Sequence, residues 1–145
     1  MNSIRLSKSN LRVENISAQT LTKKYNTPFY CYSLLQLKNN FYNFSKAFRE
    51  TKPLICFSVK SNSNIALLKE LKKIGSGADV VSAGELLKAT KAGINVKKIV
   101  FSGIGKTESE IKLAIKKRVL LINMESESEA NLINKISKKM SRKTS

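Results

Sequence analysis

Short apolar runs and longer amphipathic segments alternate along this chain. The runs are rich in β-branched and aromatic side chains and predict buried strands at residues 54–59, 78–81, 98–102 and 119–123. The segments between them place apolar residues three or four positions apart, which predicts a helix after each strand. Because such an alternation produces a parallel sheet covered by helices, we expect the α/β class.

Three successive units share one design, in which a strand leads through a short polar turn into a helix. The strands are expected to begin near residues 77, 98 and 119, a period of 21 residues. Each helix opens with the capping-box pattern, a serine or threonine followed three positions later by glutamate. The pairs are Ser82 with Glu85, Thr107 with Glu110, and Ser126 with Glu129. Uniform short repeats favour a (β/α) barrel over an open doubly wound sheet, the other closure that this pattern allows.

The first part of the chain predicts further, less regular elements. Residues 10–15 alternate apolar and polar positions as a short strand does, and Ser17 is placed to cap a helix. Residues 29–32 predict another strand, after which Ser33 caps a helix with one apolar stripe. We expect this stripe to be core; it comprises Leu34, Leu37, Phe41, Phe44 and Phe48.

The predicted elements suggest two parts. We expect residues 1–27 to form a short strand–helix segment and residues 28–145 to form a barrel domain. That domain is expected to be a partial (β/α)8 barrel of the TIM type, with about five of the eight strands such a barrel needs.

Composition limits the class of protein. The chain has 145 residues, 41% of them hydrophobic, which is enough for one modest core. It contains no apolar run long enough to span a membrane and no signal-peptide pattern, so a cytoplasmic location is expected. Cys31 and Cys56 are then expected to be reduced thiols. With no histidine and no cysteines spaced for zinc, most metal sites and histidine-base mechanisms are excluded, and we expect no metal.

The charge of the chain is strongly positive, with 27 Lys and Arg against 10 Asp and Glu and a net charge of +17. Such a balance is typical of proteins that bind nucleic acid or anionic membranes. Here the lysines are dispersed on the polar sides of predicted helices, without the interleaved aromatic residues of nucleic-acid-binding surfaces. We therefore interpret them as a solvated surface and expect neither a nucleic-acid nor a membrane partner. A basic, non-catalytic nucleic-acid-binding protein is the alternative from another class.

One lysine occupies a position suited to chemistry. Side chains alternate between the two faces of a strand, so Cys56, Ser58 and Lys60 are expected to share one face of the strand at 54–59. Lys60 falls where this strand ends, and α/β proteins bind ligands at the carboxyl ends of their strands. A desolvated lysine amine loses its proton readily and is nucleophilic, as Schiff-base chemistry requires. Position alone favours the other interpretation, in which the lysine extends into solvent.

A second motif, Gly-Ile-Gly-Lys-Thr at residues 103–107, looks like the end of a phosphate-binding loop. The Walker pattern needs a glycine five residues before Gly105, and Val100 stands there. A P-loop nucleotide-binding protein, with Lys106 on the phosphates, is therefore a distant alternative.

Residues 57–62, Phe-Ser-Val-Lys-Ser-Asn, resemble the signature around the cofactor lysine of the alanine racemase-like, fold-type III pyridoxal-phosphate decarboxylases. Five stretches carry the resemblance in the family's order, and together they are highly specific. They lie at residues 27–33, 55–64, 77–86, 99–107 and 123–126. The last two favour the diaminopimelate decarboxylases over the ornithine, arginine and carboxynorspermidine decarboxylases of the same fold, which are the alternatives within the family.

The resemblance implies a (β/α)8 barrel in which Lys60 forms a Schiff base with pyridoxal 5'-phosphate. The implied reaction converts meso-2,6-diaminopimelate to L-lysine and CO2, the last step of lysine biosynthesis. Lys60 is then catalytic and cofactor-binding. Asp79 matches an acidic position beside it and is the second catalytic candidate; the structural alternative for Asp79 is a strand-end acid satisfied by backbone amides. Glu85 matches a position near the cofactor, although its place in the capping box already gives it a structural role. The family forms homodimers.

The resemblance also assigns parts of the site to segments beyond residue 145. These are the glycine-rich turns that hold the phosphate, a histidine and a glutamate at the cofactor ring, and residues of a C-terminal β-domain. We therefore expect the 145-residue chain by itself neither to catalyse decarboxylation nor to hold the cofactor tightly.

Overall fold

The computed structural model describes residues 3–7 and 10–145. The chain divides into two compact units, Met1–Pro53 and Leu54–Ser145, and each is described by itself. None of the helices in these described ranges combines the length and the apolar character needed to cross a membrane.

The first unit contains a small antiparallel sheet and two helices. In chain order its elements are β1 (Ile4–Ser7), β2 (Asn10–Val13), β3 (Ile16–Ser17), α1 (Ala18–Lys24) and α2 (Leu34–Ala47). The predicted N-caps are confirmed, because the hydroxyl of Ser17 accepts a hydrogen bond from the Thr20 amide and that of Ser33 from the Gln36 amide. These contacts satisfy amides at the helix ends that have no partner inside the helix.

Two predictions for this unit are wrong. Residues 29–32 do not form a strand, and Tyr30 is 90% exposed. A strand needs a neighbour for its backbone groups, and no neighbouring strand pairs with these residues in the described part of the chain. The apolar stripe of α2 is not core either, since no residue of this helix is buried and Phe44 is 54% exposed.

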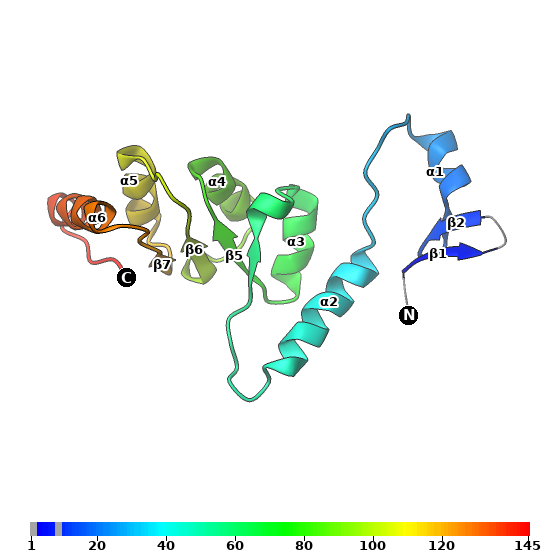
Figure 1. Cartoon of the computed structure of the whole chain (residues 1–145), viewed down its shortest axis with the longest axis horizontal. Coiled ribbons are helices and arrows are strands. Elements are labelled where there is room, and N and C mark those ends of the chain that lie inside the picture. The colour runs from blue at the N-terminus through cyan, green and yellow to red at the C-terminus, as the bar shows by residue number, and fades with distance from the viewer. Residues whose placement is uncertain (1–2, 8–9) are drawn as a thin grey trace. The chain divides into compact units, whose positions relative to one another are not determined.

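The second unit is a parallel sheet in which a helix follows each strand (Figure 1). Its elements are β4 (Cys56–Ser58), the 3-10 turn η1 (Val59–Ser61), α3 (Ile65–Lys73), β5 (Gly77–Val80), α4 (Ala83–Lys91), the 3-10 turn η2 (Val96–Lys98), β6 (Ile99–Phe101), α5 (Glu108–Lys117), β7 (Leu121–Ile122) and α6 (Glu127–Lys139). The strand order is β4-β5-β6-β7, which confirms the α/β class. The described sheet has four parallel strands where five were expected, because residues 29–32 form none.

The sheet has a buried face and an open face. Register places Ala78 beside Ile99, and Val80 beside Phe101, and these four side chains are fully buried. The helices supply the other half of this core with Leu68, Leu71, Leu86, Ile111 and Ile115. The opposite face is half-buried or exposed and carries Cys56, Ser58, Asp79, Val100 and Leu121. Because side chains alternate along a strand, the apolar positions decided which face received the helices.

The three predicted capping boxes form to different degrees. Thr107 and Glu110 make the complete box, in which each side chain bonds the backbone amide of the other residue. At Ser82 and Ser126 the serine accepts its hydrogen bond from the third helical amide, as predicted. The glutamates of these two helices, Glu85 and Glu129, reach instead the amide of the residue before the cap.

Charges of opposite sign collect at opposite ends of the second unit. In a parallel sheet every helix ends near the start of the next strand, so the last turns of the helices gather at the amino ends of the strands. The lysine pairs in these turns are Lys72 and Lys73, Lys97 and Lys98, Lys116 and Lys117, and Lys138 and Lys139. The acids of the first turns lie at the carboxyl ends and are Glu85, Glu108, Glu110, Glu127 and Glu129. The interpretation of the lysines as dispersed is therefore wrong for this unit.

Candidate functional site

The carboxyl ends of the four parallel strands carry a row of polar residues. Lys60 follows β4, Asp79 lies in β5, Ser102 follows β6 and Asn123 follows β7. In α/β folds ligands bind at this end of the sheet, because the loops there leave polar groups and backbone amides unpaired. The row is the candidate site.

Lys60 lies just beyond its strand and not on it. β4 ends at Ser58, and the next three residues form the turn η1. Lys60 is therefore not part of the strand face that carries Cys56 and Ser58, which corrects that detail of the sequence analysis. Its side chain is exposed, so the desolvation expected for a buried strand end is not present in this chain.

The turn that carries Lys60 is held in place on both sides. Val59 is fully buried, with 0% exposure, and anchors the turn in the core. The hydroxyl of Ser61 donates to the carbonyl oxygen of Ser58 at 2.7 Å, and the amide of Asn62 donates to that of Val59 at 3.1 Å. The amine of Lys60 is thus presented from a fixed backbone at the carboxyl end of the sheet.

Asp79 belongs to a chain of hydrogen bonds that crosses three strand ends. Its Oδ1 accepts a hydrogen bond from the hydroxyl of Ser102 at 2.6 Å, and that hydroxyl accepts one from Nδ2 of Asn123 at 2.9 Å. The Asp79 side chain is bonded to a hydroxyl, and not to the backbone amides proposed as its structural partners. This chain fixes the orientation of the carboxylate on the open face of the sheet.

Sequence reasoning missed Ser102 and Asn123. A signal was available, since each is the first residue after its strand in successive βα units. The pairing of neighbouring parallel strands brings those two positions together.

Ser58 has a buried hydroxyl without a partner. Its Oγ is fully shielded from solvent and makes no hydrogen bond within the described residues. The residue pairs with Asp79 in the sheet and lies two positions before Lys60. Because an unsatisfied buried hydroxyl is costly, native proteins keep such groups mainly where they serve a site. Ser58 is therefore a second feature, beside Lys60, that marks this part of the sheet as a candidate site.

Cys56 lies on the same face and has no sign of reactivity. Burial raises the pKa of its thiol, and the negative charge of Asp79 raises it further. Its Sγ lies 3.8 Å from the carbonyl oxygen of Lys98. Cys56 is thus a free thiol, as the sequence analysis expected, and it is held protonated on the half-buried face of the sheet.

Glu85 has the structural role that the sequence analysis favoured. Its Oε2 accepts the amide of Val81 at 2.9 Å, and its own amide caps the helix through Ser82. Among the described residues no hydrogen bond or ion pair joins Glu85 to Lys60 or to Asp79.

Lys106 is buried and fully bonded, which contradicts the P-loop alternative. Its Nζ donates to the carbonyl oxygens of Gly103 at 2.6 Å and Asn123 at 2.7 Å, and to Oε1 of Glu129 at 2.9 Å. The three donors of the ammonium group are thus used within the protein, and the side chain is 1% exposed. We call these four residues the Lys106 network; it ties the loop after β6 to the loop after β7 and to α6.

Comparison with known proteins was made by family, by sequence and by structure. Residues 34–143 match a family model described as the pyridoxal binding domain of pyridoxal-dependent decarboxylases. The diaminopimelate decarboxylase of Helicobacter pylori strain J99 is 45% identical to this chain over 122 residues, which is 84% of the chain and 30% of the relative. That of Aquifex aeolicus is 42% identical over 133 residues, or 92% of the chain and 31% of the relative.

A solved structure extends the likeness to three dimensions. The crystal structure of diaminopimelate decarboxylase from M. jannaschii in co-complex with L-lysine is 32% identical, with a TM-score of 0.93 over 99% of this chain and 34% of that one. The chain therefore spans about 30% of the length of the curated relatives that it matches.

Proposed function

The chain belongs to the family of pyridoxal-dependent decarboxylases, within its pyridoxal-binding domain, and from this premise we propose that its protein is a diaminopimelate decarboxylase. The proposed reaction removes CO2 from meso-2,6-diaminopimelate and yields L-lysine. Support comes from relatives of that name and from the L-lysine present in one matching structure. The observation that carries the proposal is the fixed turn that presents the amine of Lys60 at the carboxyl end of a parallel sheet.

The residues present suit pyridoxal phosphate. An aldehyde cofactor needs a primary amine, and Lys60 offers an exposed one. The buried hydroxyl of Ser58 and the carboxylate of Asp79 add polar groups on the same face of the sheet. When bound, pyridoxal phosphate supplies an electron sink for the pair of electrons that the departing carboxylate leaves behind.

Each of these residues has a defined task in the proposal. Lys60 would hold the cofactor through Nζ, and the same atom would carry a proton for transfer to the substrate carbon. Asp79 supplies a carboxylate, and the hydrogen bond that it accepts from the hydroxyl of Ser102 fixes the orientation of this group. Glu85, bonded to the amide of Val81, supports the loop after β5 and does not take part in the reaction.

Two further features are proposed from the family resemblance. We propose that residues 28–145 belong to one barrel domain, preceded by a segment at residues 1–27. We also propose that the whole protein forms a homodimer.

A chimera tests the function. The matching segment of the Helicobacter pylori relative would be replaced by this chain, and CO2 release from meso-2,6-diaminopimelate would be measured. We expect turnover by the chimera, its loss in Lys60→Ala, and its retention in the control Lys69→Ala, which removes an exposed helical lysine. Turnover that survives Lys60→Ala would contradict the assigned role of Lys60, and a folded chimera without turnover would contradict the proposed function.

The cofactor contact has a test of its own. The chain would be incubated with pyridoxal phosphate and reduced with borohydride, and the modified lysines would be mapped by mass spectrometry. We expect modification of Lys60 to exceed that of Lys69, which is also exposed, because Lys60 lies at the carboxyl end of the sheet near the carboxylate of Asp79. Equal modification of the two lysines would count against the site.

A further inference from the structure

The hydrogen bonds that end at Asp79 run in one direction. Nδ2 of Asn123 donates to the hydroxyl oxygen of Ser102 at 2.9 Å, and that hydroxyl donates to Oδ1 of Asp79 at 2.6 Å. We call these three residues the Asp79 relay. They lie at the carboxyl ends of β5, β6 and β7, and Lys60 lies at the same end of the sheet.

The direction follows from the single proton of the Ser102 hydroxyl. A hydroxyl group donates one hydrogen bond, an amide NH2 group only donates, and a carboxylate only accepts. Because Nδ2 of Asn123 donates to the Ser102 oxygen, the serine proton is left for the carboxylate of Asp79. With the amide reversed, two acceptors would face that one proton. The observed orientation of Asn123 is therefore the one in which both contacts are hydrogen bonds.

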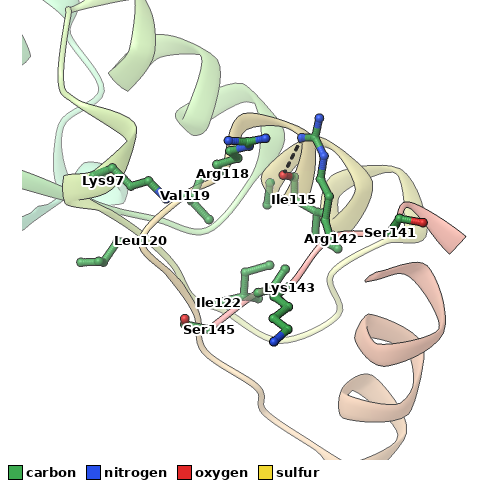
Figure 2. A pocket seen from close by; sticks show the side chains of 12 residues that line it. Lys97, Ile115, Arg118, Val119, Leu120, Ile122, Ser141, Arg142, Lys143 and Ser145 are labelled. Carbon is green, nitrogen blue, oxygen red and sulfur yellow. Dashed lines mark hydrogen bonds between the residues drawn. The ribbon is translucent and has the colours of Figure 1, made fainter. Parts of the chain in front are cut away.

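The backbone of the sheet holds both donors of the relay in place. The amide of Ser102 donates to the carbonyl oxygen of Val80 at 2.8 Å, and the amide of Asn123 donates to that of Phe101 at 2.9 Å. Each residue thus extends the hydrogen bonding of its strand by one position. Figure 2 shows the segment that leads into β7, where the amide of Leu120 donates to a carbonyl oxygen of β6 at 2.9 Å. The strand that carries Asn123 is therefore bonded to β6 at both of its ends.

The buried ammonium group of Lys106 fixes the spacing between the two loops of the relay. It donates to the carbonyl oxygen of Gly103, the residue after Ser102, at 2.6 Å, and to the carbonyl oxygen of Asn123 at 2.7 Å. Its third bond, to Glu129 at 2.9 Å, ties both loops to α6. The backbone amide, the backbone carbonyl and the side chain of Asn123 are therefore all bonded, and the side chain is held against Ser102.

The relay ends beside the turn that carries Lys60. Asp79 is the register partner of Ser58, and η1, which contains Lys60, begins at the next residue and contacts β5. The two loops of the relay are already held by Lys106 and by the sheet, so their stability does not need a carboxylate at the end of the hydrogen bonds. The bond to Asp79 instead orients an acidic group toward one environment, the carboxyl end of the sheet.

We propose that Asn123 is a positioning residue that acts through Ser102 to hold the carboxylate of Asp79 in one orientation beside the turn of Lys60. This inference rests on the proposed function, because Asp79 has its task only where the cofactor is held by Lys60. It makes a distinctive prediction for two substitutions. Asn123→Asp keeps the shape of the side chain but accepts the Ser102 proton, so Asp79 loses its donor. Asn123→Ala removes the side chain and leaves that proton to Asp79.

The chimera with the Helicobacter pylori relative tests this order of effects. We expect Asn123→Asp to lower kcat for meso-2,6-diaminopimelate about tenfold, with little change in KM, because the orientation of Asp79 changes and the substrate contacts do not. Asn123→Ala should lower kcat less. If position 123 only filled space, the nearly isosteric Asn123→Asp would be the milder variant. The matched control Asn131→Asp makes the same change at an exposed position of α6 and should retain the kcat of the unaltered chimera.

A second readout needs neither cofactor nor activity. The side-chain amide of Asn123 gives a pair of signals in the 15N–1H correlation spectrum of the 145-residue chain, which are identified by their absence in Asn123→Ala. We expect Ser102→Ala to shift this pair toward the positions of exposed asparagines, because the amide loses its acceptor. Ser109→Ala, at an exposed position of α5, should leave the pair unchanged.

The outcomes separate this inference from the function on which it rests. A folded chimera without turnover contradicts the proposed function. Turnover in which Asn123→Asp is milder than Asn123→Ala overturns the positioning role alone, and Asn123 signals that do not move in Ser102→Ala overturn the relay itself. If the chimera with Asn123→Asp does not fold by circular dichroism, Ser102→Ala takes its place. A lowered kcat is expected there too, and an unchanged kcat would overturn the proposal.

Discussion

The buried ion pair between Lys106 and Glu129 gives a sharp prediction for stability. Replacing Lys106 with methionine keeps most of the volume of the side chain but removes its charge and three donors. The two partners are 1% and 9% exposed, so the Glu129 carboxylate would remain in the interior without its cation. Within the described residues, the carboxylate would keep the hydrogen bond that it accepts from the amide of Glu125 at 2.8 Å.

The size of the effect follows from this burial. Removing one partner of a buried ion pair costs about 3–5 kcal/mol of unfolding free energy, because the other charge is left uncompensated. α5 contains a matched surface pair, Lys112 and Glu108, whose side chains are about half exposed and 2.6 Å apart. Solvent screens that pair, so Lys112→Met should cost only about 0–1 kcal/mol.

The effect of Lys106→Met should depend on pH. Burial acts to raise the pKa of Glu129, but the bonds from the Glu125 amide and from Lys106 outweigh it, and the net result is a lowered pKa. A carboxyl group with a lowered pKa stabilises the fold above its unfolded pKa, and this stability is lost as pH falls through the folded value. The loss caused by Lys106→Met should therefore be greatest near neutral pH and decrease in acid.

The assay must report on the second unit. The chain contains no tryptophan, and all its tyrosines precede residue 54, so intrinsic fluorescence would report on the first unit. Urea unfolding followed by far-ultraviolet circular dichroism reports on all the helices, and most of the helical residues lie in α3 to α6. The reasoning from burial is refuted if Lys106→Met and Lys112→Met lower the free energy of unfolding by the same small amount. It is also refuted if the decrease caused by Lys106→Met becomes larger in acid.

Other predictions concern local packing, a thiol and a cap. Gly77→Ala should lower the free energy of unfolding, measured in urea, by several kcal/mol, because a Cβ there would overlap a backbone carbonyl oxygen and lie 2.8 Å from Cys56 Sγ. Gly84→Ala, in a helix with open space around it, should raise the free energy of unfolding by about 0.5–1 kcal/mol. Equal effects of the two substitutions would contradict this prediction. Iodoacetamide should alkylate exposed Cys31 much faster than Cys56, as peptide mass mapping would show, and faster reaction of Cys56 would contradict its burial. Thr107→Ala removes the capping box and should lower the free energy of unfolding by about 1 kcal/mol in the same assay. Thr107→Ser keeps the hydroxyl and should therefore retain most of the stability that the capping box contributes.

The sequence by itself determined the local elements and the family of the fold. Caps such as Thr107 with Glu110 join residues three positions apart, so their chemistry can be read along the chain. The alternation of strands and helices required a parallel sheet, and the strands β5, β6 and β7 begin 22 residues apart, close to the expected period. The place of Lys60 at the carboxyl end of a strand also followed, because it needs only the direction of that strand.

Tertiary structure decided the features that depend on the pairing of distant segments. The hydrogen bonds that join Asp79, Ser102 and Asn123 exist because register sets three strand ends side by side. The burial of Lys106, which turned an apparent phosphate ligand into a structural cation, required α6 to supply Glu129.

The same reason explains the errors of the sequence analysis. The run at residues 29–32 has strand composition, yet composition cannot supply a neighbour for its backbone. The lysine pairs are dispersed along the sequence, but the parallel topology brings the last turn of each helix to the same end of the sheet, where the strands begin. The backbone fixes the spacing of residues within one segment, and this spacing can be read from the sequence. Which residues of different segments become neighbours is decided only when the strands pair and the sheet forms.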